Sequence, residues 1–378
     1  MQNGPQNGAN GLGFWGAAGI TMDPVNHHLF VADNSDNNRI LVYTLNTDNS
    51  IPTASGGHTA SYVLGATGLP SNVGDFLCTP STFNGGAAGL DFDAANGRLF
   101  VSDGDRVLIF DNMSTISNGM AASYVLGESS LTNCTDNGFT QSTFENAFGV
   151  AYDPVNQRLF VTDDSGSRVL VFNVPTGTNL NGENASYVLG QSSFTASGTG
   201  TTSTTFHFDG EALAFDAVNQ RLFVADTGNN RVMVFNVAPG SISNGEAASY
   251  ELGQADFTSN CCQYSGFTQS TVDFPGGITY DATSSRLFVY RGGASSLVVF
   301  NVGPSVIQNN ENASFVLGSS SFTSSPGGVS QSTFDSGNIN TFLYYDPGSQ
   351  RLFLSDTNNN RVLIFDVSPM GAWSPGYE

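Results

Sequence analysis

The 378-residue sequence predicts an all-β protein: a six-bladed β-propeller of four-stranded antiparallel blades, with a sixth blade that lacks an obvious outer strand. A Leu-Phe pair recurs six times, 60 to 70 residues apart, beginning at Leu29, Leu99, Leu159, Leu222, Leu287 and Leu352. The third and fourth copies each have four short apolar runs separated by Gly, Asn, Asp and Pro, and no segment shows a helical period. Repeated units of four antiparallel strands are typical of propeller blades.

The third copy shows the four expected strands, which we call A to D, at 149–153, 158–163, 168–174 and 185–191. Strand A is small and rich in glycine because the innermost strands crowd around the axis. Strands B and C carry apolar residues on both faces because each blade packs between two neighbours. With strand A innermost, strand D is expected to be the outermost strand of each blade.

The expected organisation is a flexible tail (1–13), one propeller (14–369) and a C-terminal tail (370–378) that is a candidate blade-closing strand. The blades are expected at 14–66, 83–128, 144–191, 206–254, 272–319 and 334–369. Strand D is clear in five copies and missing from the sixth, whose strand C would then be an exposed edge. Two alternatives stay open. In the first, the N-terminal or the C-terminal tail closes the blade within the chain. In the second, a strand from a neighbouring subunit closes it and builds a filament head-to-tail.

The motif DTGNNRVMVF at 226–235 resembles the NHL repeat, of the bacterial, secreted or surface type. Close variants stand at 356–365 and 33–43, and the resemblance extends over about residues 14–369. It implies the propeller fold, and it says little about function because propellers host many activities.

Charged residues recur at fixed positions of the repeat. Five copies end strand B with Asp and begin strand C with Arg, giving the expected pairs Asp33 and Arg39, Asp103 and Arg106, Asp163 and Arg168, Asp226 and Arg231, and Asp356 and Arg361. In the fifth copy Arg291 and Ser296 stand at these positions, and the joint change indicates that the two residues are partners. We expect partly exposed ion pairs that close the B–C turn, each contributing about 0.2–1 kcal/mol.

A second set of charges lies at the A–B turn, where Asp ends strand A and Arg begins strand B in the last five copies. Ten of the 11 basic residues, all of them Arg, thus belong to the repeat scaffold. The net charge of −21 disfavours binding to nucleic acids and to anionic membranes. No apolar stretch approaches the length of a membrane span, and the N-terminus lacks the features of a signal peptide.

The sequence predicts no catalytic residue, no cofactor and no metal site. The axis-facing positions of strand A offer one acid, Asp91, and no His, which is too few for a metal cage. The alternative is an axis-site lyase or hydrolase that uses a metal near His207, Asp209 or Asp91, with Glu211 close by. Calcium is the alternative cofactor because the B–C turns are rich in Asp and Asn, although none matches an EF-hand loop.

Cys78, Cys134, Cys261 and Cys262 all lie in D–A connections on one face of the propeller. We expect them to form disulfides in an oxidising compartment, with the connectivity open; a Cys78–Cys134 bond would join neighbouring loops. Candidate glycosylation sites are Asn112, Asn133, Asn184 and Asn312.

The function that these features favour is a non-enzymatic structural or interaction propeller, extracellular or at the cell surface. Its expected partner is a protein, a second copy included, which would give a filament or a surface layer. Besides the axis-site enzyme, the remaining alternative is a glycan-binding module that uses Trp15 and Trp373.

Overall fold

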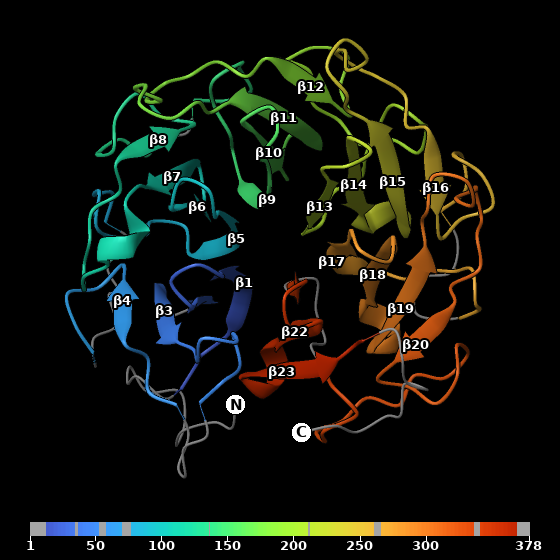
Figure 1. Cartoon of the computed structure of the whole chain (residues 1–378). Helices are drawn as coiled ribbons and strands as arrows, with labels where there is room; N and C mark the ends of the chain where they lie inside the picture. The colour runs from blue at the N-terminus through green and yellow to red at the C-terminus, as the bar shows by residue number, and fades with distance from the viewer. Residues whose placement is uncertain are drawn as a thin grey trace.

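The structure is a computed structural model that describes residues 13–34, 37–52, 58–69, 77–135, 137–210, 212–260, 266–335 and 341–368. In these residues 23 strands form six antiparallel sheets around a central axis (Figure 1). The first five sheets have four strands and the sixth has three. The predicted fold class is therefore confirmed.

The strands follow the expected A-to-D order in the first three blades. They are β1 (Ala17–Asp23), β2 (His28–Asp33), β3 (Arg39–Thr44) and β4 (Tyr62–Leu64); β5 (Ala87–Asp93), β6 (Arg98–Asp103), β7 (Arg106–Phe110) and β8 (Tyr124–Leu126); and β9 (Ala147–Asp153), β10 (Arg158–Asp163), β11 (Arg168–Asn173) and β12 (Tyr187–Leu189). The outer strand of each blade is only three residues long, shorter than the apolar run in the sequence.

The last three blades repeat this pattern, with one strand fewer in the sixth. They contain β13 (Leu213–Asp216), β14 (Arg221–Asp226), β15 (Arg231–Asn236) and β16 (Tyr250–Leu252); β17 (Pro275–Asp281), β18 (Arg286–Arg291), β19 (Ser296–Asn301) and β20 (Phe315–Leu317); and β21 (Leu343–Asp346), β22 (Arg351–Asp356) and β23 (Arg361–Asp366). Four single-turn 3₁₀ helices occur in loops: η1 (Met113–Thr115), η2 (Thr227–Asn229), η3 (Gly292–Ala294) and η4 (Thr357–Asn359).

The core consists of the interfaces between neighbouring blades. On β10, Leu159 and Val161 pack with the second blade, whereas Phe160 packs with the fourth. Phe160 lies 5.4 Å from Phe215 of the fourth blade, between ring centroids, and equivalent aromatic pairs occur at other interfaces. Both faces of β10 are thus fully buried, which explains its continuous apolar sequence.

Strand A needs small residues because adjacent blades nearly touch at the axis. A Cβ atom added to Gly89 on β5 would collide with the backbone carbonyl of Phe148 in the next blade. A Cβ atom on Gly19 of β1 would collide with the backbone of Ala88 in the same way. Glycine at this position permits the close approach that closes the ring.

Candidate functional site: the open edge of the sixth blade

The aspartate that ends strand B fixes the connection between blades. In the fourth blade, Asp226 Oδ2 accepts a hydrogen bond from Arg231 Nε at 2.7 Å, and its Oδ1 accepts one from the backbone amide of His207 at 2.7 Å. Burial raises the pKa of Asp226, although Arg231 acts to lower it. The same amide-to-aspartate bond occurs in four other blades, at Asp33, Asp103, Asp163 and Asp356.

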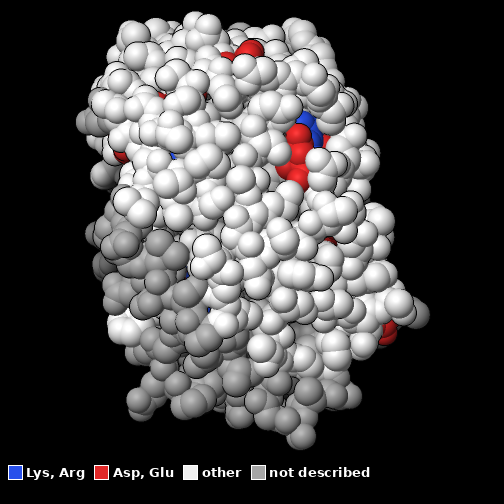
Figure 2. Space-filling model, turned by 90° about the vertical axis from the view of Figure 1, so that its left-hand side faces the viewer, with Lys and Arg blue, Asp and Glu red and all other residues white. Residues whose placement is uncertain are grey.

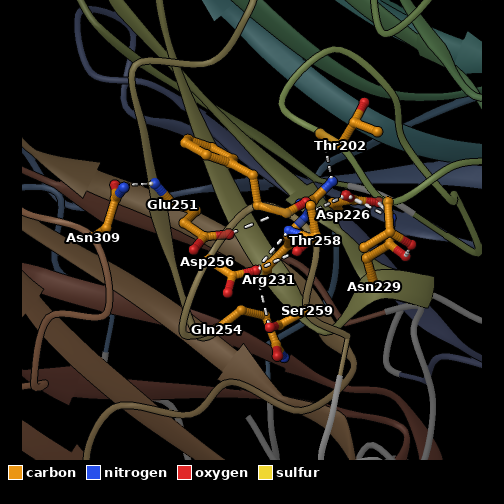
Figure 3. A network of polar contacts seen from close by, with 12 residues as sticks. Thr202, Asp226, Asn229, Arg231, Glu251, Gln254, Asp256, Thr258, Ser259 and Asn309 are labelled. Atoms are coloured by element: carbon orange, nitrogen blue, oxygen red, sulfur yellow. Dashed lines mark hydrogen bonds and ion pairs between the residues drawn. The ribbon is translucent and has the colours of Figure 1, made fainter.

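The arginine that begins strand C holds the same connections from the other side (Figure 3). Arg231 Nη1 donates to the carbonyl of Phe257 at 2.7 Å, and its Nη2 donates to the carbonyls of Thr202 and Thr205 at 2.8 and 3.1 Å. Both partners of the Asp226–Arg231 pair are 0% exposed. The expectation of partly exposed pairs is therefore wrong for the first four blades, because the D–A connections fold over these pairs. In the sixth blade the Arg361 side chain is 15% exposed. Removing one partner of a buried pair typically costs about 3–5 kcal/mol.

The fifth blade keeps this arrangement with the arginine on the other strand. Arg291 on β18 pairs in register with Ser296 on β19, and Arg291 Nη2 donates to Ser296 Oγ at 2.8 Å. Its Nη1 donates to the carbonyls of Thr268 and Phe322, at 3.3 and 3.1 Å, which match the carbonyls bound by Arg231. Burial lowers the pKa of Arg291 to about 10. The predicted partnership of these two positions is confirmed, and the exchange preserves the anchoring of the connections.

The charges at the A–B turn are also structural. Asp153 Oδ2 binds Arg158 Nη2 at 2.7 Å, and its Oδ1 accepts the turn amides of Val155 and Asn156. Arg158 Nη2 also donates to the carbonyl of Val237 in the next blade at 2.8 Å. Because the arginines lie inside, the face shown in Figure 2 carries few charged atoms.

Each outer strand of the first four blades is held on both edges. One edge pairs with strand C, and on the other edge the amide of the middle residue donates to an asparagine in the next blade. These bonds, 3.0 to 3.1 Å long, join Val63 to Asn118, Val125 to Asn181, Val188 to Asn244, and Glu251 to Asn309. The outer strands are therefore anchored by the blade that follows them.

The sixth blade ends at β23, which pairs with β22 on one side only in the described residues 341–368. Leu363 and Ile364 of β23 are half-buried, whereas Met233 and Val234 at the same positions of the fourth blade are 0% exposed. The outer strand β20 of the fifth blade is also more exposed than its equivalents. Among the described residues, no strand therefore covers the outer edge of β23, which lies at the bottom of the ring in Figure 1. The tails 1–12 and 370–378 lie outside the described residues.

The five complete blades define what would fit beside β23. In the third blade Leu189 is buried, and Gly190, with a φ of 81°, packs so closely on Phe206 that a Cβ atom would collide with its ring. Four residues after this glycine, the carbonyl of Phe194 accepts a hydrogen bond from Arg168 Nη1. All five complete blades have an aromatic residue, one further residue and then Leu-Gly. We expect a completing strand to have the same pattern, followed by a carbonyl that reaches Arg361.

The structure does not assemble the metal site near His207. His207 and Asp209 are exposed, Glu211 lies outside the described residues, and Asp91 accepts the backbone amide of Tyr152 at 2.6 Å. Burial raises the pKa of Asp91 to about 6. The residues that the structure describes contain no group of three His, Cys, Asp or Glu able to hold a metal ion. The B–C turn aspartates, which suggested calcium, direct their carboxylates at arginine and backbone donors.

One predicted disulfide is present. Cys78 and Cys134 are bonded, with Cα atoms 5.9 Å apart, and join neighbouring D–A connections. Arg106 reaches the same place, because its Nη1 donates to Cys78 Sγ at 3.3 Å and to the carbonyl of Leu131 at 2.9 Å. Cys261 and Cys262 lie outside the described residues.

The remaining predicted sites differ in accessibility. Asn112, Asn184 and Asn312 are exposed, whereas Asn133 is half-buried and its Nδ2 donates to Glu128 at 2.6 Å. Trp15 is 40% exposed, and Trp373 lies outside the described residues. Among the described residues, no helix has the length and apolar character needed to cross a membrane.

No protein-family model and no curated protein matches the sequence, so the NHL-repeat resemblance is not confirmed. Among solved structures, the chain is similar to an auxiliary nutrient binding protein from Bacteroides thetaiotaomicron, with 9% identity, a TM-score of 0.54, and coverage of 93% of this chain and 68% of the other. It is also similar to a protein of unknown function from the same organism, with 13% identity, a TM-score of 0.51, and coverage of 96% and 72%. Likenesses at this identity support the fold alone.

Proposed function

We propose that this protein is a non-enzymatic, extracellular interaction propeller that binds an extended segment of another polypeptide along the free edge of β23. The edge of β23 that pairs with no strand in the described part of the chain carries this proposal, because every other strand C is covered by an outer strand. The disulfide between Cys78 and Cys134 supports an oxidising compartment. Strand addition of this kind obtains affinity from backbone hydrogen bonds and specificity from alternate side chains.

The partner that fits this edge best is a strand with the outer-strand pattern of this chain, so the proposed occupant is a second copy. In the complete blades three residues pair with strand C, as Tyr250 to Leu252 pair with Val232 to Val234. On β23 the matching residues are Val362 to Ile364. Head-to-tail donation of such a strand would produce a filament or a surface layer.

A peptide of residues 185–194, ASYVLGQSSF, tests the edge directly. Fluorescence anisotropy should show that it binds the full chain at least tenfold more tightly than a matched peptide with Leu189→Asp, because that leucine must be buried beside β23. Equal binding of the two peptides would contradict the proposal. Binding that appears only after residues 370–378 are deleted would show that the chain closes its own blade.

Self-association is tested separately by negative-stain microscopy and sedimentation velocity at rising protein concentration. Filaments that disappear when residues 1–13 are deleted would identify this segment as the donor. Filaments that are unchanged by the deletion would exclude it. A protein that stays monomeric but binds the peptide would be an acceptor for another protein and not for itself.

A further inference from the structure

The interface between the fourth and fifth blades contains an open pocket of about 340 Å³. It lies where the starts of β14 and β16 and the end of β15 face the loop that follows β19. The lining residues include Asn219, Arg221, Asn236, Tyr250, Pro304 and Ile307. This volume is within the range of small-molecule sites in proteins.

The neighbouring interface shows how the same positions are filled elsewhere. Between the third and fourth blades, the Oε1 atom of Gln220 accepts hydrogen bonds from Asn156 Nδ2 at 2.6 Å and from Arg158 Nη2 at 3.3 Å. Arg158 Nη2 also donates to the carbonyl of Val237 at 2.8 Å. A carboxamide and a backbone carbonyl from the next blade thus satisfy the donors at this interface.

Within the described residues, Arg221 makes neither of these contacts and donates only to Asp216. Ser285 stands where Gln220 stands one blade earlier, and its hydroxyl is engaged by Tyr280. Arg221 is 8% exposed, and its Nη1 has no hydrogen-bond partner in the described structure. Within the described residues, Asn219 Nδ2 donates to Asp216 alone, at 2.8 Å. The exchange of Gln for Ser removes an acceptor at the interface where the pocket occurs.

The charge around the pocket selects a neutral ligand. The Arg221 guanidinium is already paired with Asp216 at 2.7 Å, so it has little charge to offer an anion. The net charge of −21 repels anions further. The pocket combines amide and guanidinium donors with an apolar wall that includes Pro304 and Ile307.

We propose that this pocket binds a small neutral carboxamide or acetamido group, whose carbonyl oxygen takes the place that Gln220 Oε1 occupies in the neighbouring interface. The carbonyl accepts hydrogen bonds from Asn219 Nδ2 and Arg221 Nη2, the atoms equivalent to those that bind Gln220 Oε1. The methyl or methylene group packs against the apolar wall. Such a group is presented by a glutamine side chain and by an N-acetylated sugar.

The test uses saturation-transfer NMR on the full chain with two matched pairs of probes. Propionamide is compared with propanol to represent the glutamine source, and N-acetylglucosamine with glucose to represent the sugar source. We expect the carbonyl compound of at least one pair to give transfer and its partner to give none. The pair that responds identifies the source, and no transfer from either carbonyl compound would overturn the proposal.

Two variants place the binding in this pocket. Ser285→Gln restores the missing acceptor and should reduce binding at least tenfold. Its fold is expected to be kept, because Ser285 and Gln220 share a φ of 52°. Gln220→Ser should open the equivalent pocket one blade earlier and add a second site. Binding that Ser285→Gln leaves unchanged would overturn the assignment, whatever the behaviour of Gln220→Ser.

Discussion

Glu251 is the sharpest departure from the repeat inside the core. Four other outer strands have valine at its position, yet Glu251 is 0% exposed and neither of its carboxylate oxygens has a hydrogen-bond partner. The nearest positive charge is Arg231 Nη1, 3.8 Å away, which already donates to the carbonyl of Phe257 (Figure 3). Burial raises the pKa of Glu251 from 4.5 to about 7.

The direction of the pH effect follows from this shift. A carboxyl group with a raised pKa binds its proton more tightly in the folded state. Its destabilising effect is therefore absent below pH 4.5, grows as the pH rises to about 7, and is constant above. At 1.36 kcal/mol per pH unit the full effect is on the order of 3 kcal/mol. The variant Glu251→Val should thus have a higher free energy of unfolding than the natural chain at pH 8. The difference between the two proteins should be smaller at pH 4, by about 3 kcal/mol.

The assay is urea unfolding followed by circular dichroism between pH 4 and pH 8. We compare the urea midpoint of Glu251→Val with that of the natural chain at each pH. With a denaturant slope of about 3 kcal/mol/M, the difference between the two midpoints should be about 1 M larger at pH 8 than at pH 4. Glu251→Gln is the matched control, because it keeps the size and polarity but cannot ionise. A midpoint difference that is the same at every pH would refute the reasoning.

Three further predictions concern the scaffold, and urea unfolding at pH 7 checks each. Arg231→Met should cost about 3–5 kcal/mol because it leaves a buried aspartate unpaired; a loss below 1 kcal/mol would contradict the buried geometry. Gly89→Ala should cost about 1–3 kcal/mol because the backbone of Phe148 must move; an unchanged midpoint would show that the blades are not in contact at the axis. Reducing the bond between Cys78 and Cys134 should cost about 4 kcal/mol, since it closes a loop over a sequence separation of 56; equal stability with and without reductant would contradict this.

The repeat alone was enough to predict the fold and several contacts. Strand B ends at Asp226 and strand C begins at Arg231, as the copies indicated, and the two are paired in register. The joint change to Arg291 and Ser296 correctly indicated partners, because residues that touch must change together. One disulfide, Cys78–Cys134, was among the expected pairings because its cysteines lie in adjacent connections.

Burial was not predictable from the repeat. The repeat predicts partial exposure of the Asp226–Arg231 pair, because a turn lies at the edge of its sheet. The connections that cover the pair come from elsewhere in the sequence. The pocket beside Arg221 was missed for a related reason. The signal was visible as Ser285 in place of glutamine, but only the structure shows that the glutamine at this position, Gln220, binds the arginine of the preceding blade.

By itself the sequence determined the number of blades, the order of strands and the partners across each turn, because these depend on periodicity and local pairing within one copy. Only the tertiary structure decided which charges are buried, how each outer strand is anchored and which interface is left open. These properties arise between copies, where a residue such as Asn309 meets the strand of the preceding blade. The free edge of β23 is the place where that anchoring is absent from the described residues, and it is where we propose that a partner binds.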